Sequence, residues 1–216
     1  MPKKLFTPEQ LQELENAVKQ AESISGGEIV PVFVKQSSIY ELALWRSAFL
    51  FSLISGAIMI LLYLIDDAFL FLPPYFWLLI PFTFGMLGAL AAVSIPSFKR
   101  MMIGQLMMNE KVEAKAKSKF LDHGVSLTDQ RSGVLILISF FEHKAIILAD
   151  VGIAELIPDD VWQEIVSELT QGIKKGELMQ SINQAILQCG KAIAESGLQK
   201  PDGGNNELSD AIIIEN

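Results

Sequence analysis

The sequence contains a single cysteine, Cys189, and only two histidines, His123 and His143. A lone thiol forms no internal disulfide, and it fits a reducing compartment. Two scattered histidines without cysteine partners exclude the usual zinc-ligand spacing, and we place His143, beside Glu142, in a hairpin turn. The chain also lacks a Gly-rich phosphate loop, a dinucleotide fingerprint and a nucleophile elbow, which excludes the commonest nucleotide-binding and serine-hydrolase motifs.

Positive charge is scarce relative to negative charge. There are 17 lysines and arginines against 25 aspartates and glutamates, which gives a net charge of -8, and this acid excess argues against a nucleic-acid partner. The mean hydropathy is nevertheless positive, because half of the residues are hydrophobic. The apolar and charged populations must therefore be separated along the chain.

Charge is absent from two long stretches. Residues 47–65 carry no charged side chain over about 19 positions, and residues 75–95 carry none over about 21. At about 1.5 Å per residue, each stretch could span a hydrocarbon core of about 30 Å. The alternative is a helix pair buried in a soluble core, but two consecutive uncharged stretches of this length are rare there. We therefore predict a transmembrane helical hairpin over residues 46–97.

Asp66 and Asp67 lie between the two uncharged stretches. A carboxylate at the centre of a bilayer would cost several kcal/mol, so the pair predicts the point where the chain leaves the membrane. Pro73 and Pro74 then suit a turn followed by the first turn of a helix, where no backbone N–H is needed.

The positive charges that flank the spans predict the orientation. Arg46 precedes the first span, Lys99 and Arg100 follow the second, and the loop between the spans has neither lysine nor arginine. Because lysine and arginine near span ends favour the cytoplasmic side, we expect a multi-pass protein of the inner (cytoplasmic) membrane, with both termini and the globular domain in the cytoplasm. The opening MPKKLFTPEQ has no apolar segment, so we expect no cleaved signal peptide.

The rest of the chain suits one ordinary domain with an insertion. We expect residues 1–45 and 98–198 to form the two parts of this domain, separated by the hairpin. Residues 199–216 contain PDGGNN, which is typical of a turn or linker. We therefore assign them to a linker and tail, whose apolar residues 211–214 could dock as an edge strand.

Capping residues, proline and apolar runs predict the elements of this domain. Thr7 and Gln10 form a capping pattern that begins a helix. Pro31 indicates that the first strand lies at an edge or contains a bulge. The strands that flank FFEH are almost continuously apolar, which predicts burial on both faces. The expected elements are a helix from Thr7 to about Gly26, a strand at 28–35, a long helix at 98–123, strands at 133–139 and 144–150, and helices at 158–176 and 177–197.

Three stretches resemble one known family: SGGEIVPVFV, RSGVLILISFFEHKAIILADVGIAELIPDDVWQEIV and the closing helix. They are similar to the TPM domain family, and most similar to a bacterial membrane-protein branch. The resemblance implies an α/β fold, a three-layer α/β/α sandwich with a short central mixed sheet. In this sequence the membrane hairpin interrupts the crossover between the first two strands. The resemblance also implies calcium binding and weak phosphatase activity, which are linked to relatives.

Acidic residues near strand ends form the candidate metal site. A parallel crossover followed by an antiparallel third strand brings Glu28, Asp129 and Asp150 to one edge of the sheet, together with Arg131. Their oxygen atoms suit Ca²⁺ or Mg²⁺. In the alternative interpretation, Asp129 begins a turn, Asp150 ends a strand and Arg131 neutralises one of them.

Basic residues near the spans form a second candidate set. We expect these side chains to face anionic lipid head groups: Arg46, Lys99, Arg100, Lys111 and Lys115. A solvated helix face is the alternative for the lysines.

Two functions of different class remain. The first is a non-catalytic interaction module, an accessory or assembly factor whose partners are the lipid bilayer and another membrane protein or a second copy of itself. Small residues four apart, Ser52 with Gly56 and Gly85 with Ala89, allow the close helix packing this requires. The second is a divalent-metal-dependent phosphatase at the acidic edge. No cofactor other than Ca²⁺ or Mg²⁺ is indicated.

Overall fold

The computed structural model describes residues 6–65, 73–198, 208 and 211–215. The chain divides into two compact units. One consists of Met1–Ser37 and Lys111–Asn216, and the other of Ser38–Glu110. Asp66 and Asp67, the predicted exit from the membrane, lie outside the described residues.

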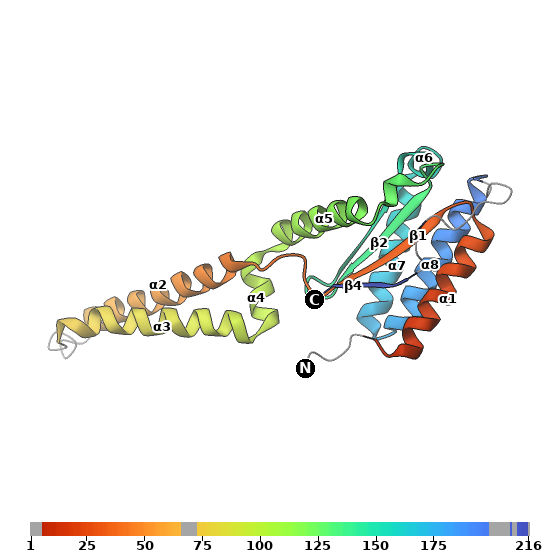
Figure 1. The fold of residues 1–216 in the computed structure, drawn as a ribbon. Helices are drawn as coiled ribbons and strands as arrows, with labels where there is room; N and C mark the ends of the chain where they lie inside the picture. Colours follow the sequence, from red (N-terminus) through yellow and green to blue (C-terminus); the bar gives the residue numbers. More distant parts are fainter. Residues whose placement is uncertain (1–5, 66–72, 199–207, 209–210, 216) are drawn as a thin grey trace. The chain divides into compact units, whose positions relative to one another are not determined.

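The elements follow one another in the order shown in Figure 1. They are α1 (Pro8–Ile24), β1 (Glu28–Val34), α2 (Glu41–Ile65), α3 (Pro74–Ser94), α4 (Pro96–Ile103), α5 (Gln105–Asp122), the 3-10 helix η2 (Val125–Leu127), β2 (Gly133–Ser139), β3 (Lys144–Ala149), α6 (Val151–Ala154), α7 (Asp159–Lys175), α8 (Leu178–Glu195) and β4 (Ile213–Glu215).

The first helix begins as its sequence predicts. The backbone N–H of Gln10 donates to Thr7 Oγ1 at 3.3 Å, and the Thr7 N–H donates to Gln10 Oε1 at 2.9 Å. This reciprocal pair satisfies two amide donors that would otherwise lack an intrahelical partner. The capping pattern is therefore confirmed.

A four-stranded mixed sheet with the order β3-β2-β1-β4 forms the centre of the larger unit. β1 and β2 are parallel, with Glu28 opposite Gly133, and β3 pairs with β2 in the antiparallel sense. β4 pairs in parallel with residues 32–34 of β1, so the tail supplies the expected edge strand. The expected edge position or bulge of β1 is wrong, because β1 lies between β2 and β4 and pairs with β2 without interruption. The sheet tolerates Pro31, which cannot donate a ladder hydrogen bond, because this residue lies just before the pairing with β4 begins.

Helices cover both faces of this sheet. Alternate residues such as Phe33 and Ile136 pack beneath α1, α7 and α8, which lie together on one face (Figure 1). The other face, which includes Val32, packs against Val112 and Ala116 of α5. The expected three-layer α/β/α sandwich is confirmed.

Two further expectations about single elements are wrong. β2 is buried throughout, but β3 is only partly buried because it is the outermost strand of the sheet. The helix expected over residues 98–123 is broken at Gly104, whose φ of 82° ends α4 before α5 begins. The predicted stop at Gly124 is confirmed, since it has a φ of 66°, a conformation that glycine adopts without steric cost.

The smaller unit contains the two apolar helices, which pack side by side as an antiparallel hairpin. Gly88 lies against Ser47 near one end, and the Tyr63 and Trp77 rings meet edge to face near the other. A Cβ atom on Gly88 would lie 2.6 Å from the Ser47 carbonyl oxygen, so only glycine permits this approach. Both helices are long and apolar enough to cross a membrane.

Candidate functional site

Two of the three predicted metal ligands share one edge of the sheet. Glu28 opens β1 opposite Gly133, and the N–H of Asp150, directly after β3, donates to the Gly133 carbonyl oxygen at 2.9 Å. Both carboxylate side chains are buried. Glu28 and Asp150 therefore lie at the same edge of the sheet, as expected from the strand directions.

The contacts of Asp150 are those of a structural residue. Its Oδ1 accepts from the Val151 N–H at 2.8 Å and caps α6, and its Oδ2 lies 3.0 Å from Arg131 Nε. This ion pair is the one that the alternative interpretation of the acidic edge describes. Asp129 is exposed, and among the described residues no three histidines, cysteines or acids lie together in a group suited to a metal ion. The metal site stays a prediction.

Sequence reasoning missed a buried polar cluster at the opposite edge, where β1 and β2 end. Glu142 accepts from the Ser37 N–H at 2.8 Å and from the Ser139 hydroxyl, and Ser37 Oγ donates to Ser139 Oγ at 3.0 Å. The partners lie about a hundred residues apart in sequence, so no local pattern could reveal them. The cluster ties the hairpin turn to the end of β1.

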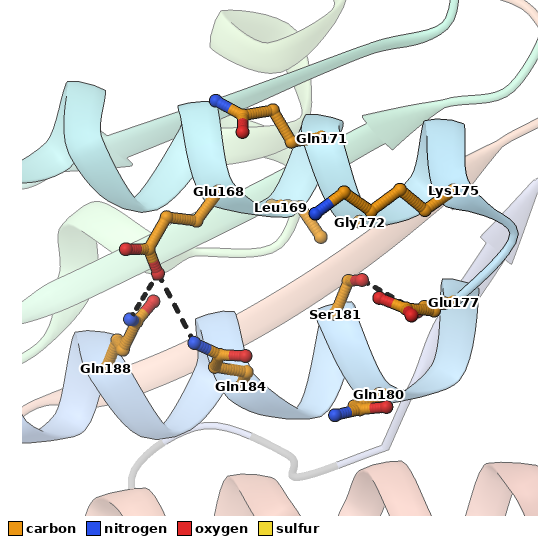
Figure 2. A pocket seen from close by; sticks show the side chains of 10 residues that line it. All are labelled: Glu168, Leu169, Gln171, Gly172, Lys175, Glu177, Gln180, Ser181, Gln184 and Gln188. Atoms are coloured by element: carbon orange, nitrogen blue, oxygen red, sulfur yellow. Dashed lines mark hydrogen bonds between the residues drawn. The ribbon is translucent and has the colours of Figure 1, made fainter.

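A polar groove of about 220 Å³ runs between α7 and α8. Glu168 Oε2 accepts hydrogen bonds from the side-chain amides of Gln188, at 2.6 Å, and Gln184, at 3.3 Å. Figure 2 shows these amides and the Lys175 side chain along the groove. Amide, hydroxyl and ammonium groups of this kind can hold a polar ligand or a partner's surface by hydrogen bonds.

Three of the predicted lipid-facing cations bind groups within the smaller unit. Arg46 Nη1 donates to the carbonyl oxygens of Met102 and Ile103, at 3.1 and 3.2 Å, and so caps the last turn of α4. Lys99 Nζ donates to the Ile39 carbonyl oxygen at 2.9 Å, and Arg100 Nη2 donates to the Ser97 hydroxyl at 3.3 Å. Their contact with lipid stays a prediction.

The two lysines of α5 that we expect to face lipid head groups differ in their contacts. Lys111 is exposed, whereas Lys115 lies 3.0 Å from Glu215 of β4. Lys119 lies 2.5 Å from the other oxygen of the same carboxylate. Lys115 is therefore engaged in holding the C-terminal strand, which the helical spacing of lysines did not reveal.

Protonation of Glu215 is expected to loosen β4. Burial alone raises the pKa of Glu215, but hydrogen bonds from Lys119 and Lys115 outweigh it, so the pKa lies below the ordinary 4.5. The pair therefore contributes stability at neutral pH that is lost as the pH falls through this lowered pKa. We expect Glu215→Gln to speed exchange of the Lys35 amide, which donates to the Glu215 carbonyl oxygen, by up to about fivefold, since a partly exposed pair contributes about 1 kcal/mol or less. Hydrogen exchange with mass spectrometry measures this change.

The exposed pair of Lys117 and Glu113 on the same helix supplies the matched control. Lys117→Gln should leave Lys35 exchange unchanged, whereas Lys115→Gln should raise it. Equal exchange in all three variants would show that the ion pairs do not hold β4.

The thiol of Cys189 is expected to resist modification in the folded protein. The side chain is fully buried, and burial raises its pKa to about 12. Since the thiolate is the nucleophile, only about one thiol in ten thousand is ionised at pH 8. We expect maleimide labelling to follow unfolding in urea. Rapid labelling of the native protein, at the rate of a free thiol, would contradict the buried position.

Comparison with known proteins bears on the family and the fold. A family model described as the TPM domain matches residues 90–192. The NMR structure of the BA42 protein from the psychrophilic bacterium Bizionia argentinensis superposes with a TM-score of 0.60 at 17% sequence identity, covering 99% of this chain and 98% of that one. At this identity the likeness shows the fold alone. Among curated proteins, no significant match was found.

Proposed function

Because the chain carries a domain of the TPM family, we propose that it is a membrane-anchored, non-catalytic interaction module, an accessory or assembly factor for other membrane proteins. The inner membrane is its site of action. The positive charges that flank the hairpin support an orientation with the α/β domain in the cytoplasm.

The exposure of α2 and α3 is the observation that supports a membrane anchor. In their most apolar 18-residue windows, only 11% and 17% of the residues are buried. A core helix of a soluble domain would be largely covered by protein. Large side chains such as Trp45 and Leu78 instead point outward and are 73% and 76% exposed. An apolar surface of this extent is stable when lipid or another transmembrane protein covers it.

The groove between α7 and α8 is the face we assign to a protein partner. Gln180 and Gln184 line both this groove and a second one between α1 and α8, so α8 presents one continuous polar ridge. The side-chain oxygens of Asn183 and Gln188 on this ridge are buried and have no hydrogen-bond partner among the described residues. The exposed side-chain amides of Gln180 and Gln184 can both donate and accept hydrogen bonds to a partner.

Photocrosslinking in native membranes tests whether the α8 ridge contacts a protein partner. A photoreactive residue in place of Gln180 on the ridge should give discrete adducts with a membrane protein or with a second copy of the chain. The same residue in place of Gln163, which is exposed on α7 outside both grooves, should give none. Absence of adducts at Gln180, or the same adducts at both positions, would overturn the assignment.

A second candidate, a divalent-metal-dependent phosphatase, has one observation in its favour, the shared burial of Glu28 and Asp150 at one edge. It requires that Asp150→Asn lower phosphate release in the presence of Mg²⁺ or Ca²⁺ by about a hundredfold or more, since loss of even an outer-shell partner of a metal site costs about 10–100-fold. Asp159→Asn, on the exposed start of α7, is the control. Equal release by both variants eliminates this candidate.

A further inference from the structure

A cavity of about 440 Å³ opens beside the β2–β3 turn. It is lined by the end of β2 and the turn, by the start of β3, and by the residues where α7 ends and α8 begins. This edge of the sheet is opposite the acidic edge. Ligands of open α/β sheets usually bind at the carboxyl ends of parallel strands, and β2 ends here.

The cavity has an apolar floor. Ile138 is fully buried in the core, and Phe140, Ile173 and Leu178 are partly buried and pack against the same core. Its volume falls in the usual range for a site that holds one small ligand. A single acyl chain suits this size, whereas the two chains of a phospholipid would exceed it.

The charged side chains that line the cavity are of one sign. None of the described residues that line it is acidic, although the whole chain carries a net charge of -8. Lys144 lies at the start of β3 and Lys174 in the last turn of α7. In the part of the chain that the structure describes, neither ammonium group has a hydrogen-bond or ion-pair partner. The site thus combines an apolar interior with two unpaired cations.

We propose that this cavity binds one long-chain fatty acid, with the acyl chain on the apolar floor and the carboxylate between Lys144 and Lys174. A charge-assisted hydrogen bond from an ammonium group to a carboxylate is stronger than a neutral one. The inference does not depend on the proposed interaction role, because a free fatty acid can reach the site with or without a protein partner.

A photoactivatable palmitate tests the site on the full chain in nanodiscs of phosphatidylcholine. After illumination, mass spectrometry should map adducts to residues 138–144 and 170–178. Lys144→Glu and Lys174→Glu should each reduce labelling about tenfold, the factor that one charge-assisted hydrogen bond supplies. Lys19→Glu, at an exposed position of α1 outside the cavity and both grooves, should leave labelling unchanged.

Competition experiments distinguish a free fatty acid from a phospholipid as the ligand. Unlabelled palmitate should abolish the adducts, and the neutral hexadecanol should not. Nanodiscs that contain phosphatidylglycerol should also leave the adducts in place; if the phospholipid displaces the probe, the fatty-acid assignment is wrong. Labelling confined to α2 and α3, or an equal loss in the Lys19→Glu variant, would overturn the site itself. Circular dichroism of each variant distinguishes loss of binding from loss of the fold.

Discussion

A Gly133→Val variant is expected to yield no folded sheet. A Cβ atom at this position would lie 2.2 Å from the Val125 carbonyl oxygen and 2.6 Å from Val125 Cγ1. The carbonyl belongs to the backbone of η2, and Val125 is itself fully buried, so neither atom can move aside cheaply. Gly133 also pairs with Glu28 and accepts a hydrogen bond from Asp150. Displacing it therefore disturbs three strands at once.

The expected loss of stability in Gly133→Val is large relative to the stability of a typical domain. Ordinary overpacking costs about 1–3 kcal/mol, and a clash with backbone should exceed that range. Whole domains are stable by only about 5–15 kcal/mol. Two measurements in detergent report the loss of the folded sheet: resistance to trypsin and circular dichroism. The control is Gly176→Ala, where φ is 86° and, apart from the local backbone, no atom of the described residues lies within 4 Å of the added Cβ, so it should cost only about 1–2 kcal/mol. Equal stability of the two variants would contradict the contact with Val125.

The elements that the sequence predicts well are those with local causes. The cap at Thr7, the strands on either side of FFEH and the helix ends at Gly124 and Gly176 each depend on a few adjacent residues. The break at Gly104 was missed because an isolated glycine is usually tolerated inside a helical pattern. Only the positive φ that this residue adopts separates α4 from α5.

The interactions that could not be predicted join residues distant in sequence. An apolar strand has the same pattern whether it lies in the centre of a sheet or at its edge, so the partial exposure of β3 follows only from the strand order. The ion pair of Lys115 with Glu215 and the hydrogen bond of Glu142 with Ser37 each close a loop of about a hundred residues. Topology did place Glu28 and Asp150 at one edge, because strand direction fixes which ends meet. It could not place the groove of α7 and α8, which depends on how two helices pack.

Excision of the hairpin is expected to make the chain soluble without detergent. Ser47 and Gly88 are in contact, so the start of α2 and the end of α3 lie about one helix spacing apart, roughly 8–10 Å. A ten-residue Gly/Ser linker in place of residues 44–91 has a mean span of about 17 Å and can join them. The excised segment contains nearly all of the exposed apolar surface of α2 and α3. The variant should remain in the supernatant after ultracentrifugation and elute as a discrete species, whereas the intact chain should stay with the membranes.

Solubility alone would not show that the α/β unit has folded, and the Gly133→Val substitution provides the control. Both helical layers and all four strands lie in Met1–Ser37 and Lys111–Asn216, so the core of this unit does not need α2 or α3. The excised chain should retain mixed α/β circular dichroism and a cooperative urea transition, and the same chain with Gly133→Val should lose both. If the excised chain instead aggregates while the intact chain stays in solution without detergent, α2 and α3 are covered by protein rather than lipid, and the membrane anchor is wrong.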